Sequence, residues 1–129
     1  MAITSIGSDL CQISRIEELL ESSAESFCDK IFTRGEREYC DSNSRGRASH
    51  YAGRYAVKEA VMKALGTGWG EGVRWQDIET TRTPAGAPEL LLHGETAALA
   101  RERGITRWHV TITHDAGLAL AFVVAESSS

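Results

Sequence analysis

Two places along the chain combine ionisable side chains with a backbone that can present them. Asp9 follows Gly7 where a first strand is expected to end, and a carboxylate there either points toward a ligand or caps a turn. Glu59 and Lys63 stand four residues apart, so on a helix they share one face. That spacing suits an exposed ion pair as well as a pair of catalytic groups, and spacing alone does not separate the two.

The segment that carries Glu59 and Lys63 also carries Arg54 and Lys58, again four residues apart, and it runs into GTGWGEG at 66–72. Four glycines in those seven residues exclude the interior of a helix or a strand. A bare glycine backbone can approach a phosphate chain closely. Helix and loop together therefore predict an anion-binding site.

Two histidines, His109 and His114, mark a third place in the segment HVTITH. Residues five apart on a strand point to opposite faces, so the two are not expected to share one site, and either alone also suits a structural role. The three cysteines are too widely spaced for a CxxC pair or a zinc knuckle and are expected to be buried or idle thiols. A few carboxylates plus phosphate oxygens suit Mg²⁺ better than Zn²⁺. The residues alone thus predict a Mg²⁺-dependent site for a phosphorylated ligand.

The helices that must position these residues follow from capping signals and periodicity. Ser14 with Glu17, and Thr33 with Glu36, have the spacing of N-terminal capping boxes. The Ala-rich segment before Gly66 is rich in good helix formers, and the glycine is a plausible C-cap. Helices are then expected at about 14–23, 33–40, 50–65 and 95–103.

Strands are expected where apolar and polar residues alternate, at 2–9, 73–81, 88–93, 108–113 and 118–126. The polar, basic stretch 41–49 is expected to be an exposed, mobile loop. These elements predict a single α+β domain over residues 1–126, in which a mainly antiparallel sheet packs with the long helix. Residues 127–129 are expected to be a frayed tail.

The composition excludes several classes of protein. Among 129 residues, 42% are hydrophobic and 25% charged, as in an ordinary globular domain. A formal net charge of −4 argues against a general nucleic-acid binder, and no apolar run approaches a membrane span of about 20 residues. The first residues lack a basic stretch ahead of an apolar block, so a cytoplasmic location is expected. Residues 30–63 carry eight bases against four acids. This basic segment is expected to be either a solvated face or a surface for an anionic ligand or an acidic partner.

Six segments carry a pattern beyond these local signals. They are IGSDLCQISRI (6–16), KIFTRGERE (30–38), YAGRYAVKEAVMKALGTG (51–68), WQDIE (75–79), TPAGAP (83–88) and HVTITH (109–114). With an early G-x-D and a later K-E-A-x-x-K-A, the chain resembles the holo-acyl-carrier-protein synthase type of 4'-phosphopantetheinyl transferase over nearly its whole length. The fold of that family is then expected.

The resemblance implies a reaction. In that family 4'-phosphopantetheine moves from coenzyme A to a serine of an apo acyl carrier protein, leaving adenosine 3',5'-bisphosphate. By motif, Asp9 and Glu59 would be catalytic residues that bind Mg²⁺ at the pyrophosphate of coenzyme A. Glu59, or a metal-bound water that it orients, would take the proton of the attacking serine. Lys63 would stabilise or protonate the departing phosphate.

The resemblance also implies residues that bind coenzyme A. Arg54 and His114 match the family's contacts to the nucleotide part, including its 3'-phosphate. Gly66, Thr67 and Gly68 would border the path of the phosphates and the pantetheine arm. Members of this short type are homotrimers with active sites at subunit interfaces, so His114 would serve Asp9 and Glu59 of the partner subunit.

The first predicted helix departs from the family pattern. Family members usually present several basic residues there to an acidic carrier protein, whereas here Arg15 is its only base. Arg15 is thus the one expected carrier-binding residue on that helix. Its acids are Glu17, Glu18, Glu21 and Glu25, and further docking bases are expected among Lys30, Arg34, Arg37, Arg45 and Arg47.

Two other functions are compatible with parts of the pattern. A trimeric module that binds coenzyme A or a carrier without turnover is disfavoured by the intact Asp9, Glu59 and Lys63. A Mg²⁺-dependent phosphohydrolase is disfavoured because the sequence has no dense carboxylate cluster for two metals. The sequence leaves open whether the carrier serves fatty acid or polyketide synthesis and whether acylated coenzyme A is accepted.

Overall fold

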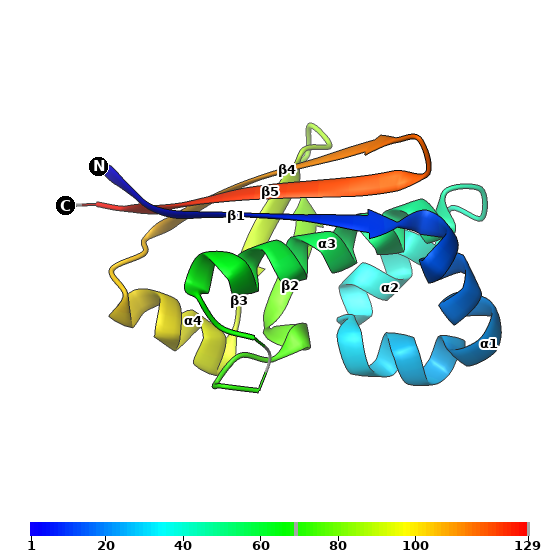
Figure 1. The fold of residues 1–129 in the computed structure, drawn as a ribbon, viewed down its shortest axis with the longest axis horizontal. Helices are drawn as coiled ribbons and strands as arrows, with labels where there is room; N and C mark the ends of the chain where they lie inside the picture. Colours follow the sequence, from blue (N-terminus) through cyan, green and yellow to red (C-terminus); the bar gives the residue numbers. More distant parts are fainter. Residues whose placement is uncertain (69, 129) are drawn as a thin grey trace.

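The computed structural model describes residues 1–68 and 70–128 (Figure 1). In chain order its elements are β1 (Ala2–Gln12), α1 (Ile13–Ile31), α2 (Arg34–Asp41), α3 (Arg47–Leu65), a 3-10 turn η1 (Trp75–Asp77), β2 (Ile78–Arg82), β3 (Pro88–Leu92), α4 (Gly94–Glu102), β4 (Arg107–Asp115) and β5 (Leu118–Ser127).

Two antiparallel sheets share the core with the helices. The larger sheet has the strand order β1-β5-β4, and β2 and β3 form a separate hairpin. Helix α3 lies along one face of the larger sheet, with α1 and α2 at one end of the molecule and α4 at the other (Figure 1). This is the expected α+β architecture, an antiparallel sheet packed with a long helix.

Small side chains allow α3 to lie close against the sheet. The inner face of β5 presents Ala119, Ala121 and Ala125, all fully buried. The helix ends at Gly66, which adopts a left-handed conformation with φ of 73°, and the Thr67 amide donates back to the Met62 carbonyl at 3.0 Å. The expected C-terminus of this helix is confirmed.

Strand β1 makes an even closer approach to α3, at Gly7. A Cβ atom built on Gly7 would stand 2.0 Å from the backbone oxygen of Ala60. No side chain fits there, because the obstacle is helix backbone and not a flexible side-chain end. Two residues further along the strand is Asp9, and one residue before Ala60 in the helix is Glu59. The glycine thus sets the contact that brings these two carboxylates to the same region.

We expect Gly7→Ala to destabilise the protein by about 1–3 kcal/mol, because the strand or the helix must shift to admit the methyl group. Urea unfolding followed by circular dichroism measures the change. Gly68→Ala is the matched control, since a Cβ at Gly68 meets nothing within 4 Å. Equal stability of the two variants would contradict the close-approach argument.

Several predicted boundaries need correction. β1 continues to Gln12 instead of ending near Asp9, so Asp9 lies within the strand and is not a turn cap. α1 begins at Ile13 without a side-chain cap, so the Ser14 capping box was wrong, and it reaches Ile31 across non-helical backbone at Ser23. The Thr33 capping box is confirmed in full.

Other boundaries move by a few residues. Helix α3 begins at Arg47, which shortens the predicted 41–49 loop, and the hairpin strand β2 begins at Ile78 after the η1 turn. Ser127 pairs with Ala2, so it is not part of a frayed tail. Ser129 and Trp69 lie outside the described residues.

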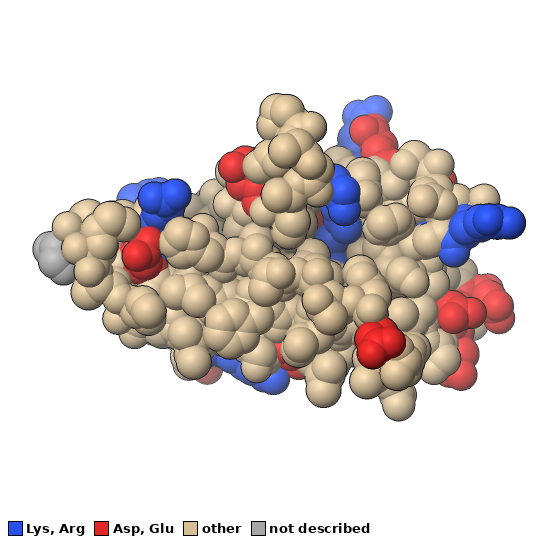
Figure 2. Space-filling model, turned by 90° about the horizontal axis from the view of Figure 1, so that it is seen from above, with Lys and Arg blue, Asp and Glu red and all other residues tan. Residues whose placement is uncertain are grey.

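The outer face of the larger sheet exposes large apolar side chains next to polar ones such as Ser8 and Thr111, which pair with Phe122. Its exposed side chains include Ile6 and Leu10 of β1, at 57% and 61%, and Leu120 and Phe122 of β5. Figure 2 shows this face as a broad uncharged expanse with the charged side chains mainly around its rim. Large apolar side chains exposed together on a sheet face indicate a candidate interaction site.

Candidate active site

The two expected metal ligands line one cleft. Asp9 of β1 and Glu59 of α3 border a cavity of about 300 Å³, together with Cys11, Arg15 and Tyr55. Asp9 points to the α3 side because alternate residues of β1 face the helix, as the buried Gly7 and Cys11 do. The cleft is therefore built where the sheet edge, the start of α1 and the middle of α3 meet.

Burial in the cleft raises the pKa of the Glu59 carboxyl, and the neighbouring Asp9 charge raises it further. Lys63, a hydrogen bond from the Tyr55 hydroxyl and Arg15 act in the opposite direction. Burial also raises the pKa of the Cys11 thiol to about 11, so this cysteine is a neutral wall of the cleft. Two close carboxylates in a partly desolvated cleft favour the binding of a cation.

Lys63 reaches across to β1. Its Nζ donates to the Ser8 carbonyl at 3.0 Å and to Asp9 Oδ1 at 3.1 Å. The spacing suggested a surface pair with Glu59, whereas in the structure Lys63 forms its ion pair with Asp9. The Lys63 side chain is 56% exposed, so its ammonium group is open to solvent beside Asp9, one of the residues that line the cleft.

The donor set fits Mg²⁺. Asp9 and Glu59 supply two carboxylates, and within residues 1–68 and 70–128 no group of three or more His, Cys, Asp or Glu side chains is placed to bind a metal. Mg²⁺ is commonly held by one or two carboxylates with water and substrate phosphates completing its shell, whereas Zn²⁺ takes a closed set of protein ligands.

Lys58 is not available to an anion, contrary to the anion-site interpretation of α3. It is completely buried, its Nζ bonds Glu36 Oε1 at 2.8 Å and the Trp75 carbonyl at 2.9 Å, and it also donates to the Ile78 carbonyl. Burial lowers the pKa of its ammonium group, and the Glu36 charge opposes that change. Lys58 is a structural residue that ties α3 to α2, η1 and β2.

The expected nucleotide-binding residues lie in a second place, outside the cleft. Arg54 is 3% exposed, with its guanidinium 4.3 Å from the centroid of the Tyr39 ring. His114 Nε2 donates to the Ser49 carbonyl at 3.0 Å. The His114 ring lies next to Gly53, where an added Cβ atom would stand 3.3 Å from that nitrogen. Neither residue lines the Asp9 and Glu59 cleft.

The other expected residues lie in different parts of the fold. His109 is on the opposite sheet face from His114, bonded to Glu126 at 2.7 Å, which confirms the opposite-face prediction. Arg15, expected at the carrier, lines the cleft itself. Gly66 caps α3, while Gly68 borders open space.

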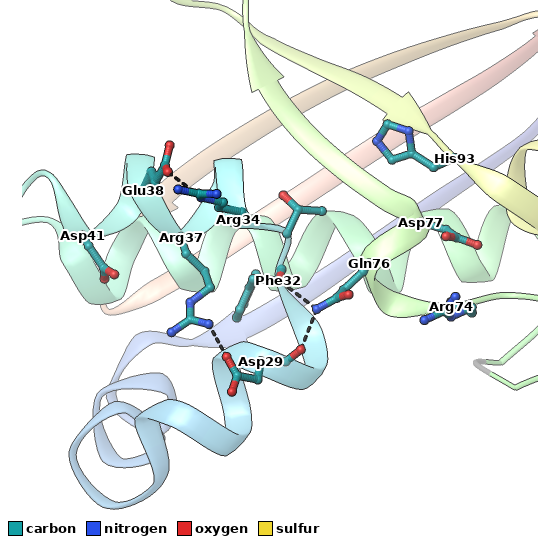
Figure 3. Close-up of a pocket in the computed structure, with 11 residues that line it drawn as sticks. Asp29, Phe32, Arg34, Arg37, Glu38, Asp41, Arg74, Gln76, Asp77 and His93 are labelled. Carbon is teal, nitrogen blue, oxygen red and sulfur yellow. Dashed lines mark hydrogen bonds and ion pairs between the residues drawn. The ribbon is translucent and has the colours of Figure 1, made fainter.

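A larger cavity, of about 900 Å³, lies elsewhere; among the expected residues it contains only the docking candidates Arg34 and Arg37. It is bordered by the end of α1, by α2 and by η1 (Figure 3). Several of its polar side chains already have partners: Arg37 contacts Asp29, Arg34 contacts Glu38, and the Gln76 amide donates to the Phe32 backbone carbonyl. This mutual pairing leaves little to recognise a ligand.

Sequence reasoning missed Tyr55 as part of the cleft. Its ring stacks on Trp75 with centroids 5.4 Å apart, and its hydroxyl reaches Glu59. The spacing of four residues before Glu59 on a helix was a signal that could have found it.

The fold thus places two carboxylates and a lysine between a long helix and an edge strand. The chain belongs to the 4'-phosphopantetheinyl transferase superfamily, whose family model matches residues 5–123. It is 49% identical to the holo-[acyl-carrier-protein] synthase of Methylobacterium sp. (strain 4-46), over 97% of this chain and 95% of that protein.

Solved structures agree with the family assignment. The crystal structure of holo-[acyl-carrier-protein] synthase from Neisseria meningitidis matches with a TM-score of 0.88 and 30% identity, over 98% of this chain and 100% of that one. The Helicobacter pylori enzyme in complex with coenzyme A matches with a TM-score of 0.82 and 32% identity, over 94% and 99%. None of the helices in the described part of this chain has the length and hydropathy to cross a membrane.

Proposed function

We propose that this chain transfers 4'-phosphopantetheine from coenzyme A to a serine hydroxyl of an apo acyl carrier protein. The observation that carries the proposal is that Asp9 and Glu59, from two elements, line one cleft and Lys63 bonds Asp9, in a chain of this superfamily. The holo carrier protein and adenosine 3',5'-bisphosphate are the products.

The reaction exchanges one phosphorus–oxygen bond for another. The serine oxygen attacks the phosphorus next to the pantetheine arm, and the bond from that phosphorus to the bridging oxygen breaks. Asp9 and Glu59 would hold Mg²⁺, which would supply neutralisation of the phosphate charge. Glu59, or a water that it orients, accepts the serine proton.

Lys63 has two tasks in this proposal. Its ammonium group beside Asp9 attracts the phosphates of coenzyme A and then neutralises or protonates the departing phosphate. The flanking Gly66, Thr67 and Gly68 border the path of the phosphates and the pantetheine arm. Arg15, at the edge of the same cleft, contacts the carrier next to its reacting serine.

We expect Lys63→Ala to lower kcat about a hundredfold, because charge develops on the leaving phosphate only during the chemical step. Initial rates over a range of coenzyme A concentrations measure kcat and KM separately. The exposed Arg101→Ala on α4 controls for the loss of one positive charge. A fall in kcat accompanied by an equal-fold rise in the KM for coenzyme A would instead make Lys63 a binding residue.

The working assembly is proposed to be a homotrimer with each active site at a subunit interface. Two observations support it. Large apolar side chains such as Leu120 and Phe122 are exposed on the outer face of the sheet, and Arg54 and His114 lie outside the cleft of Asp9 and Glu59. In the trimer, Arg54 and His114 of one chain bind the nucleotide whose pyrophosphate lies at the carboxylates of the partner subunit.

We expect Phe122→Glu to weaken self-association at least about a hundredfold, because it buries a charge in the proposed interface. Sedimentation velocity measures the oligomeric state, and transfer activity is expected to fall with it. Leu91→Glu, at an exposed apolar residue of β3 outside the larger sheet, is the matched control. A trimeric Phe122→Glu variant would contradict the proposed interface.

One assay tests the function itself. The protein is incubated with coenzyme A, Mg²⁺ and an apo carrier protein, and the carrier is weighed by mass spectrometry. The expected result is the mass gain of one phosphopantetheine group. Carriers from fatty acid and polyketide synthesis are offered separately, and no mass gain on any of them would overturn the proposal in favour of a binding module.

A further inference from the structure

A cluster of cationic side chains surrounds Tyr39, outside the cleft of Asp9 and Glu59. The Arg54 guanidinium lies 4.3 Å and the Arg82 guanidinium 4.9 Å from the centroid of the Tyr39 ring. His50 packs edge-on against the same ring at 5.0 Å. These groups come from α2, α3 and β2, so the fold assembles them and no local sequence motif does.

The cluster borders a cavity of about 190 Å³ that contains an unsatisfied donor. Arg54 and Arg82 line it with Tyr39, and Arg54 Nε is buried without a hydrogen-bond partner among the described residues. Arg54 Nη1 donates to the His50 carbonyl over a long distance, 3.5 Å. A buried donor without a partner carries a cost that a bound acceptor would remove.

The acidic group in this cavity is already engaged. Glu79 also lines it, but its Oε2 accepts from the Thr33 hydroxyl at 2.9 Å and its Oε1 bonds His93 Nε2 at 2.8 Å. Two guanidinium groups therefore face the cavity against one carboxylate whose two oxygens both have partners. The local excess of charge is positive.

Burial lowers the pKa of His50, and the charges of Arg54, Arg82 and His114 lower it further. These four side chains, from α3, β2 and β4, therefore interact electrostatically. Like charges held together repel, and a bound anion relieves that repulsion.

We infer that Arg82 is a further phosphate-binding residue, which acts with Arg54 on the 3'-phosphate monoester of the nucleotide. The inference rests on the proposed function, because that function supplies a ligand with such a group. A guanidinium fork suits the oxygens of a phosphate, and the aromatic ring of Tyr39 holds both forks by cation–π contact. Arg82 would thereby help to select phosphorylated over dephosphorylated coenzyme A.

Calorimetric titration with adenosine 3',5'-bisphosphate and with AMP, which lacks the 3'-phosphate, tests the inference. The Arg82→Gln variant is compared with the intact protein, and Arg101→Gln on α4 is the control for net charge. Because Arg82 is exposed, the variant is expected to fold. We expect it to lose about tenfold in affinity for the bisphosphate and less than about twofold for AMP.

Equal losses for both ligands, or no loss for the bisphosphate, would overturn the inference. Transfer assays with coenzyme A and with 3'-dephospho-coenzyme A separate it from the proposed function. If the carrier gains mass but Arg82→Gln keeps the preference of the intact protein, the inference alone fails. If no carrier gains mass but Arg82→Gln loses its discrimination between the two nucleotides, the phosphate-binding role stands and the transferase function falls.

Discussion

Glu59→Gln is expected to lower the transfer rate about a thousandfold while the fold is retained, because the amide can neither hold Mg²⁺ as a carboxylate does nor accept the serine proton. The change is isosteric, and Glu59 is only partly buried, so packing in the cleft is preserved. Initial rates are measured by carrier mass over a range of Mg²⁺ concentrations. Mn²⁺ binding, followed by electron paramagnetic resonance without substrate, reports the metal site independently of turnover.

The control for this variant is Glu102→Gln at an exposed residue of α4, which removes the same charge far from the cleft. It is expected to have the rate and the Mn²⁺ affinity of the intact protein. Near-normal activity of Glu59→Gln at limiting Mg²⁺ would show that the carboxylate has neither of the assigned roles.

Lys58→Met is expected to destabilise the protein by about 3–5 kcal/mol. Lys58 is next to Glu59 in the sequence, but its own role is structural. The substitution leaves the buried Glu36 carboxylate without its cation and leaves the Trp75 and Ile78 carbonyls without their donor. Glu36 would retain the amides of Thr33 and Thr80. Urea unfolding measures the free-energy difference.

Two further variants isolate the cause. Lys63→Ala removes an exposed lysine from the same helix, and its free energy of unfolding is expected to change by less than about 1 kcal/mol. The double variant Lys58→Met/Glu36→Gln no longer buries an unpaired charge and is expected to regain part of the loss. A double variant that is less stable than Lys58→Met would refute the ion-pair explanation.

Local signals in the sequence predicted elements well where one interaction decides the structure. The Thr33 capping box and the Gly66 C-cap were confirmed, because a side-chain oxygen and a left-handed residue act within one turn of the chain. Ser14 failed as a cap because β1 continues to Gln12 in register with β5, and α1 starts immediately after it. Tertiary pairing thus overrode the local capping signal.

The candidate site was predictable only in part. Asp9, Glu59 and Lys63 were found from their motifs, but the sequence did not say that Lys63 reaches Asp9 across the strand. Arg54 and Lys58 have similar spacing on one helix, and only the packing of α2 and η1 makes Lys58 a buried ion-pair residue. Arg82 joins Arg54 through Tyr39, a contact between elements that no helical or strand period encodes.

The strand order has a consequence for the sequence of events in biosynthesis. β1 lies beside β5, and Ala2 pairs with Ser127, so β1 gains this neighbour only after β5 has been translated (Figure 1). Pairings between such distant segments form slowly. We therefore expect Asp9 to be positioned only after β5 has left the ribosome, so that the nascent chain, even with α3 complete, has no functional cleft.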